Sequence, residues 1–477
     1  MLPLRACCLL SILFSFVAVA EEKNEIAGLW KGEVDVPGEK IAIIFEIEKQ
    51  SAGKHSGTLL VPKQHPHKIP LTMVMIQGKE VTFDAKDVDG GFTGKLSGSG
   101  KRIRGKWEQG EYSLPLTLEL EDDEKSVSSI ARPQLSPNTS SYISREVTFL
   151  NAADGYTLAG TLTLPKDPFR PVPGVVLVSD SGPHDRDATV QLHKPFYLLA
   201  DYLTKKGFAV LRYDDRGVGK SGANFENATI NDFVTDAEAA MNFLRTEKDI
   251  DSTKLGMVGH GEGGMVAALV ATRREDARYI VMMAAPGLPG RETLITQNFA
   301  IGTASNAPAE FIKLSQNFLN SLYDVVLSQT PDINKLDETG KKFEAEAAKL
   351  GADKVATLAE LGQLIKSQVA SIQSPWMRNY LSHDPGPVLE KVTCPVLAIG
   401  GDRDLQVIAK YHLPEIEKHL KAGGNRNYSV SELKGFNHLF QECETGLPGE
   451  YGTIEQTVAP RVLKGIAEWL ISVNKSL

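Results

Sequence analysis

The chain has 477 residues, of which 42% are hydrophobic and 23% charged, and its formal net charge is −8. This length predicts about two domains or three, and the ordinary composition excludes a disordered, collagenous or coiled-coil chain. The chain lacks a basic stripe, so no nucleic-acid partner is expected.

Residues 1–20, MLPLRACCLLSILFSFVAVA, have the pattern of a secretory signal peptide. Arg5 provides the positive start, and the apolar run that follows is shorter than the roughly 20 residues of a membrane-spanning helix. Ala18-Val19-Ala20 fits a cleavage site of small residues. We therefore expect a secreted or periplasmic protein without a transmembrane span after signal removal. Of the four cysteines, Cys394 and Cys443 would remain, either paired or as free thiols.

Residues 21–125 predict an antiparallel β domain, because short apolar runs such as Lys40–Glu48 alternate with glycine-rich turns. This pattern favours a small barrel or sandwich. The opening Gly28-Leu29-Trp30 resembles lipocalin-like barrels, in which the tryptophan closes one end; alternatively, Trp30 and Trp107 are ordinary core residues. As a domain appended after a signal peptide, this part would bind cell-wall material or serve a structural role.

Residues 126–144 are rich in serine and proline and are predicted to be a linker. In residues 145–477, apolar strands alternate with amphipathic helices, which predicts a parallel sheet covered on both faces. A mostly helical insertion at about 288–385 is predicted to form a cap. The predicted strands are Arg145–Leu150, Thr157–Leu164, Gly174–Ser179, Phe208–Tyr213, Lys254–Val258, Tyr279–Ala284, Pro395–Gly400 and Tyr428–Leu433. The predicted helices are Pro195–Lys206, Thr229–Arg245, Met265–Thr272 and Leu405–Leu420, with Phe343–Gly351 and Val355–Gln373 in the cap.

The segment Gly259-His260-Gly261-Glu262-Gly263-Gly264 follows a predicted core strand and precedes a helix. Its glycine spacing is that of the strand-turn-helix elbow Gly-x-Ser-x-Gly, which carries the nucleophile of α/β hydrolases. Gly261 stands at the nucleophile position, where a serine is expected. Glycine has no side chain that can attack a substrate.

Other parts of a hydrolytic site follow neighbouring strands. Asp404 is the predicted triad acid, with Asp402 as its competitor, and His438 is the predicted base after the last strand. Ser181-Gly182, with the backbone N–H of Glu262, is the predicted oxyanion hole. The charged loop residues are expected to be ion-paired supports of the pocket rim or, alternatively, substrate contacts: these are Asp185, Arg186, Asp187, Asp214, Asp215 and Arg216.

Four segments resemble a secreted or periplasmic branch of the α/β-hydrolase superfamily that is related to serine aminopeptidase-like hydrolases and small-acyl esterases. They are SGPHDRD (181–187), HKPFYLLADYLTKKGFAVLRYDDRGVGKS (193–221), GHGEGG (259–264) and GFNHLFQ (435–441). That branch usually reads Gly-His-Ser-Glu-Gly-Gly at the elbow. The resemblance implies an α/β-hydrolase fold, a small acyl-ester or peptide substrate, and neither a cofactor nor a metal.

The glycine at position 261 leaves several functions open. The chain would be a catalytically impaired ester or amide hydrolase that binds an acyl or peptide ligand, or a residual hydrolase that uses a water activated by His438 or the hydroxyl of Ser181. An artificial serine-to-glycine change would give the same sequence. A fourth alternative is a general-base enzyme that uses the His438–Asp404 pair on a non-hydrolytic reaction.

Overall fold

The computed structural model describes two compact units, one ending at residue 131 and one from residue 132 to the C-terminus. The predicted signal peptide lies outside the described residues, as do most of the predicted linker and the predicted cap helix Val355–Gln373. Among the described helices, none is long and apolar enough to cross a membrane. The described residues are 26, 28–36, 39–49, 55–61, 65–88, 90–97, 100–110, 112–121, 132–135, 141–166, 171–328, 333–349 and 374–476.

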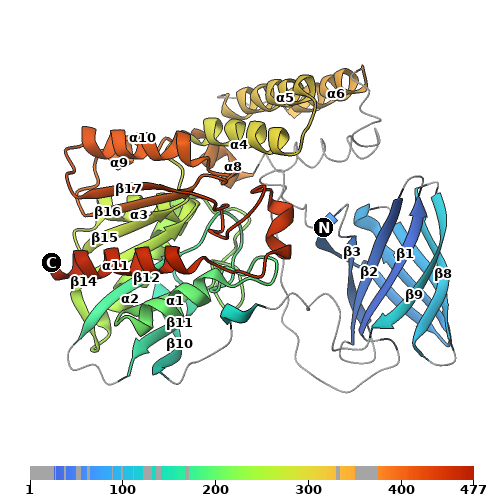
Figure 1. Ribbon diagram of the computed structural model, residues 1–477, viewed down its shortest axis with the longest axis horizontal. Coiled ribbons are helices and arrows are strands. Elements are labelled where there is room, and N and C mark those ends of the chain that lie inside the picture. The colour runs from blue at the N-terminus through green and yellow to red at the C-terminus, as the bar shows by residue number, and fades with distance from the viewer. Residues whose placement is uncertain are drawn as a thin grey trace. The chain divides into compact units, whose positions relative to one another are not determined.

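The N-terminal unit is a single antiparallel sheet of nine strands in the order β4-β3-β2-β1-β9-β8-β7-β6-β5 (Figure 1). Pairing between β1 and β9 joins the first strand of the unit to its last. One continuous curved sheet differs from a sandwich, which needs two stacked sheets. The strands are β1 (Gly28–Val36), β2 (Glu39–Lys49), β3 (His55–Val61), β4 (His65–Pro70), β5 (Met73–Gln77), β6 (Glu80–Ala85), β7 (Gly90–Leu96), β8 (Arg102–Gln109) and β9 (Tyr112–Glu121).

Aromatic side chains fill the core of this sheet. Phe45 packs on Phe83 with ring centroids 4.8 Å apart, and Trp107 lies 6.1 Å from the Phe45 ring. Trp30 is fully buried, and its indole N–H donates to the carbonyl of Ile26 at 2.9 Å. The alternating apolar positions of the strands therefore face one enclosed core, to which both tryptophans belong.

The second unit contains an eight-stranded sheet in the order β10-β11-β13-β12-β14-β15-β16-β17. β10 and β11 pair antiparallel, β11 also runs antiparallel to β13, and the other strand pairs are parallel. This strand order, with its antiparallel start, is that of the α/β-hydrolase fold, so the predicted fold class is confirmed. The strands are β10 (Tyr142–Asn151), β11 (Tyr156–Pro165), β12 (Val172–Val178), β13 (Ala209–Tyr213), β14 (Ile250–His260), β15 (Ala277–Met283), β16 (Val396–Gly401) and β17 (Tyr428–Leu433).

Helices cover both faces of this sheet (Figure 1). On β12, Val175 and Leu177 pack toward α1 (Pro195–Lys205) and α11 (Pro460–Ser476). Val176 and Val178 face the opposite side, where the covering helices are α2 (Ile230–Thr246), α3 (Glu262–Arg273) and α10 (Ala409–Ala422). Burial on both faces explains why these strands are almost continuously apolar in sequence.

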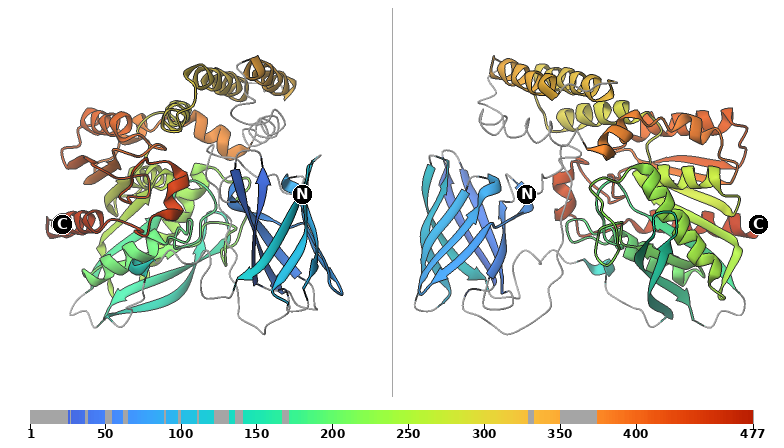
Figure 2. Two further views of the ribbon diagram at one scale, coloured as in Figure 1. Left: turned by 45° about the vertical axis from the view of Figure 1, so that its right-hand side comes forward. Right: turned by 180° about the vertical axis from the view of Figure 1, so that it is seen from behind.

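The predicted insertion between β15 and β16 is helical where the structure describes it. Helices α5 and α6 run side by side (Figure 2), and the rings of Phe318 and Phe343 stack between them at 4.5 Å. Residues 343–349 of the predicted helix Phe343–Gly351 form the last part of α6, and its last two residues lie outside the described residues. The helices of the insertion are α4 (Gly290–Ala304), α5 (Ala309–Leu327), α6 (Ile333–Lys349), α8 (Pro375–Ser382) and the short α9 (Gly386–Leu389).

Close backbone contacts hold α3 against the sheet. A Cβ on Gly263 would overlap the carbonyl oxygens of Val178 and Ser179, and a Cβ on Gly259 would overlap the backbone of Gly263. Backbone atoms move less easily than side-chain ends, so these positions require glycine.

We predict that Gly263→Ala destabilises the protein by about 1–3 kcal/mol, because the added methyl group overpacks the contact between α3 and β12. Thermal unfolding followed by circular dichroism measures the effect. The matched control is Gly465→Ala in α11, where a Cβ meets no atom within 4 Å; it should stabilise the helix by about 0.5–1 kcal/mol. Equal unfolding temperatures for the two variants would contradict the prediction.

Candidate active site

The predicted elbow lies between β14 and α3. Gly261 has φ 53° and ψ −121°, a backbone conformation that residues with a Cβ rarely adopt. Its N–H donates to the carbonyl oxygen of Met283 at 2.9 Å, which fixes the turn against the neighbouring strand β15. The elbow geometry is therefore present without the side chain that it normally displays.

Asp404 and His438 meet beside the elbow. His438 Nδ1 lies 2.8 Å from Asp404 Oδ2, and the other oxygen of Asp404 accepts from the N–H groups of Gln406 and Val407 at 2.8 and 2.9 Å. The competitor Asp402 instead accepts from the Gly435 N–H at 2.6 Å. Of the two acids, Asp404 is thus the one that orients the imidazole.

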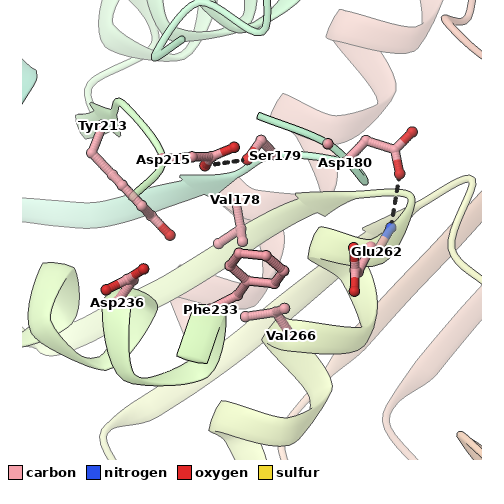
Figure 3. Close-up of a pocket in the computed structure, with 10 residues that line it drawn as sticks. Val178, Ser179, Asp180, Tyr213, Asp215, Phe233, Asp236, Glu262 and Val266 are labelled. Carbon is pink, nitrogen blue, oxygen red and sulfur yellow. Dashed lines mark hydrogen bonds between the residues drawn. The ribbon is translucent and has the colours of Figure 1, made fainter. Parts of the chain in front are cut away.

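The second nitrogen of His438 contacts Asp180, a residue that the sequence analysis did not select. Asp180 Oδ2 lies 2.9 Å from His438 Nε2. Asp180 Oδ1 accepts from the backbone N–H groups of Ser181 and Glu262 at 2.7 and 3.0 Å; Figure 3 shows the Glu262 bond. These two N–H groups are the predicted oxyanion hole, so a carboxylate oxygen of the protein occupies it.

Asp180 also occupies the space in front of Gly261. A Cβ built on Gly261 would overlap the carboxylate of Asp180. A side chain at position 261 and the observed conformer of Asp180 therefore exclude each other. The missing serine does not leave an empty place, because Asp180 fills it.

The site holds a cation between two anions. Burial lowers the pKa of His438, but the charge of Asp404 and the hydrogen bonds and charge of Asp180 outweigh it and raise the pKa to about 10. Burial would raise the pKa of Asp180, yet the hydrogen bond and charge of His438 lower it well below the usual range. Both shifts favour an imidazolium on His438 beside a carboxylate on Asp180.

The other predicted oxyanion residues have distinct places. Ser181 contributes its backbone N–H, and the side chain that contacts His438 Nε2 is that of Asp180 and not that of Ser181. Gly182 has φ 108° and shapes the loop behind them. The carboxylate of Glu262 accepts from the indole N–H of Trp376, with both oxygens at 3.0 Å. Helix α8 of the cap is therefore tied to the residue after the elbow.

Most of the predicted charged loop residues form internal ion pairs. Arg186 pairs with Asp214 at 2.7 Å and also contacts Glu146, while Arg212 pairs with Asp187. Arg216 pairs with the buried Asp236 at 2.8 Å, and Asp215 accepts from the Ser179 hydroxyl at 2.6 Å. These contacts agree with the expectation that the charged loop residues are ion-paired supports and not substrate contacts. Asp185 accepts from the backbone N–H groups of Asp187 and Thr189.

A pocket borders the site on the side of α2 and α3 (Figure 3). Its volume of about 10 Å³ is that of a single water molecule, and its lining includes both apolar side chains and carboxylates. Its lining residues are Val178, Ser179, Asp180, Gly182, Tyr213, Asp215, Phe233, Asp236, Glu262 and Val266.

The structure also groups three side chains that offer metal-ligand atoms. One atom each of Asp180, His260 and His438 lies within 4.8 Å of the others. His260 Nε2 contacts the carbonyl of His438 at 2.9 Å, and burial with the charge of His438 lowers the pKa of His260 to about 4. In the structure these three side chains are joined by hydrogen bonds, from His438 to Asp180 and between His260 and the backbone of His438.

Comparisons with known proteins agree with the fold. Residues 194–376 match the family described as "Serine aminopeptidase, S33". Esterase EstD of Thermotoga maritima is 28% identical over 319 residues, which are 66% of this chain and 65% of that protein's length. The chain thus spans slightly less than two thirds of this relative. Its second unit is an α/β-hydrolase domain similar to hydrolases of the esterase and serine aminopeptidase type.

Solved structures similar to this chain include an esterase and the protein Est1E. The Pyrococcus furiosus esterase Pf2001 gives a TM-score of 0.43 at 14% identity, covering 71% of this chain and 94% of that one. Est1E from Butyrivibrio proteoclasticus, in its form with ferulic acid bound, gives 0.40 at 15% identity, covering 69% and 99%. At these scores they serve as context, and the fold assignment rests on the strand order.

Sequence reasoning missed Asp180, although two signals pointed to it. Asp180 lies two residues after the apolar strand β12, at the sheet edge where sites of this fold lie. The second signal is Gly261 itself, because an absent side chain leaves space that a neighbour must fill in a close-packed protein.

We predict that Asp180→Asn lowers the pKa of His438, because the imidazolium loses one of its two neighbouring charges. Since the wild-type pKa is raised from 6.5 to about 10, the stabilisation from these contacts is full below about pH 6.5 and is lost as the pH rises through 10. NMR titration of the ring protons, assigned with His438→Gln, measures the pKa. Asp402→Asn is the control and should leave it unchanged; an unchanged pKa in Asp180→Asn would contradict the prediction.

Proposed function

We propose that this protein is an ester- or amide-hydrolase-type α/β hydrolase in which serine-based turnover is lost while the acyl or peptide binding site is retained. The observation that carries the proposal is the Asp180 carboxylate, which lies in the oxyanion hole and in the space of the nucleophile. The similarity to serine aminopeptidases and to an esterase supports the substrate class of small acyl esters or peptides.

Two physical effects act against ester hydrolysis. Removing the nucleophile of a serine triad costs on the order of 10⁶ in turnover. In addition, Asp180 Oδ1 accepts hydrogen bonds from the backbone N–H groups of Ser181 and Glu262. These are the two donors that would otherwise stabilise the oxyanion of a tetrahedral intermediate. A negative carboxylate in that place would also repel the developing negative charge.

The charge state of His438 disfavours the alternatives that use it as a base in the resting protein. With a pKa of about 10, its Nε2 carries a proton at neutral pH, so it neither activates a water nor abstracts a proton from carbon.

Export of the protein is part of the same proposal. Residues 1–20 have the pattern of a secretory signal peptide, which favours a secreted or periplasmic location.

We predict that the double variant Gly261→Ser/Asp180→Gly hydrolyses p-nitrophenyl acetate on the order of 10² times faster than wild type, because it restores a nucleophile and frees the oxyanion hole. Gly261→Ser alone should gain little, since the serine Cβ would overlap the Asp180 carboxylate. Steady-state kinetics of the three proteins measures this.

The control is the same double variant carrying His438→Ala, which should lose the gain. If wild type hydrolysed p-nitrophenyl acetate as fast as the double variant, the proposal that turnover is lost would be wrong. A single Gly261→Ser variant as fast as the double would show that Asp180 does not obstruct the site.

A further inference from the structure

We propose that Asp180, His260 and His438 bind a divalent transition-metal ion, and that Zn²⁺ is the cation that suits their chemistry. This goes beyond the proposed function, which concerns the loss of serine chemistry and names no metal. Two imidazole nitrogens and one carboxylate oxygen are ligand types that Zn²⁺ accepts. Among the described residues, this is the one group of three such side chains whose ligand atoms all lie within 4.8 Å of one another.

The spacing of the ligand atoms fits a tetrahedral ion. Zinc bonds to imidazole nitrogen and carboxylate oxygen measure about 2.0–2.2 Å, which places the ligand atoms of a tetrahedron roughly 3.4 Å apart. Oδ2 of Asp180 lies 2.9 Å from Nε2 of His438 and 3.9 Å from Nδ1 of His260. The first distance is shorter than the tetrahedral value and the second is longer, so small side-chain rotations place all three atoms around one ion.

Contacts at the far nitrogen of each ring orient the two histidines. Nδ1 of His438 lies 2.8 Å from Asp404 Oδ2, and Nε2 of His260 lies 2.9 Å from the carbonyl oxygen of His438. A carbonyl oxygen only accepts, so in the neutral ring Nε2 of His260 carries the hydrogen and Nδ1 keeps its lone pair. Metal-bound histidines commonly donate their other N–H to a carboxylate or a backbone carbonyl in this way.

Asp180 is held so that one of its oxygens faces the two histidines. Oδ1 accepts from the backbone N–H groups of Ser181 and Glu262 at 2.7 and 3.0 Å. Oδ2 is the oxygen that lies near His438 and His260. The carboxylate therefore binds the ion through Oδ2 alone, and the two N–H groups fix its orientation before the ion arrives.

The charges of the site suit a dication. When both imidazoles are neutral, Asp180 and Asp404 supply two negative charges, one at each nitrogen of His438. In the metal-free protein the proton on Nε2 of His438 balances part of this charge. Metal binding replaces that proton: the bond from Nε2 to hydrogen breaks, a bond from Nε2 to the ion forms, and the proton goes to solvent.

An ion reaches the site past the Asp180 carboxylate. The side chain of Asp180 is 23% exposed, compared with 10% for His260 and 3% for His438. The two histidines are thus shielded from water, and the carboxylate lies on the solvent side. Three protein ligands leave the fourth tetrahedral position to a water molecule, as in catalytic zinc sites.

The test measures zinc binding by the full-length protein after treatment with a chelator. In isothermal titration calorimetry, wild type should bind one equivalent of Zn²⁺ that Asp180→Asn and His260→Gln do not bind. Asp404→Asn keeps all three ligands but changes the contact that orients His438, so it should bind the ion about 10–100-fold more weakly. Co²⁺ bound to wild type should show the visible absorption of a tetrahedral ion.

The matched control is His419→Gln. His419 also lies near two carboxylates, 2.8 Å from Glu390 and 3.6 Å from Glu415, but it is not part of the site. This variant should bind the same equivalent of Zn²⁺ with the affinity of wild type.

The proposal is overturned if wild type binds no zinc, or if Asp180→Asn and His260→Gln bind it as wild type does. Wild-type crystals grown with Zn²⁺ and measured at the zinc absorption edge decide the matter if a variant fails to fold. An anomalous peak between the three side chains supports the site, and peaks only elsewhere overturn it. No ester is used, so the result is independent of the p-nitrophenyl acetate assay.

Discussion

The space in front of the elbow admits one side chain, and the rest of the site depends on which residue supplies it. A serine would enter from the tip of β14, but here the carboxylate of Asp180 enters from the end of β12. Both strands lie side by side in the parallel sheet, so either residue can reach His438. The sheet thus brings a side chain to the same place from two different points of the chain.

The change of side chain also changes the charge of the resting site. A serine hydroxyl is neutral and leaves its histidine with one charged partner, whereas Asp180 gives His438 a second one. The imidazolium is then stabilised from both nitrogens. A histidine held in this way by a carboxylate at each nitrogen differs from the histidine of a serine triad, whose second nitrogen faces a neutral hydroxyl.

Much of this architecture is predictable from sequence. The alternation of apolar strands and amphipathic helices gives the sheet and its two covered faces, and positions after strands select Asp404 and His438. The same reasoning could not select Asp180 as a site residue, because its contact with the elbow joins residues 82 positions apart in the sequence. The sequence displays a missing serine and an acidic residue near the end of another strand, but not the contact between them. Whether that place is empty or filled depends on packing across two strands, which no local pattern encodes.

The shared space couples positions 180 and 261. Replacing Gly261 by serine crowds the site while Asp180 remains, and removing the Asp180 side chain alone leaves no side chain at either place. Neither single substitution produces an uncrowded serine at the elbow, so the effects of substitutions at the two positions are expected to be non-additive.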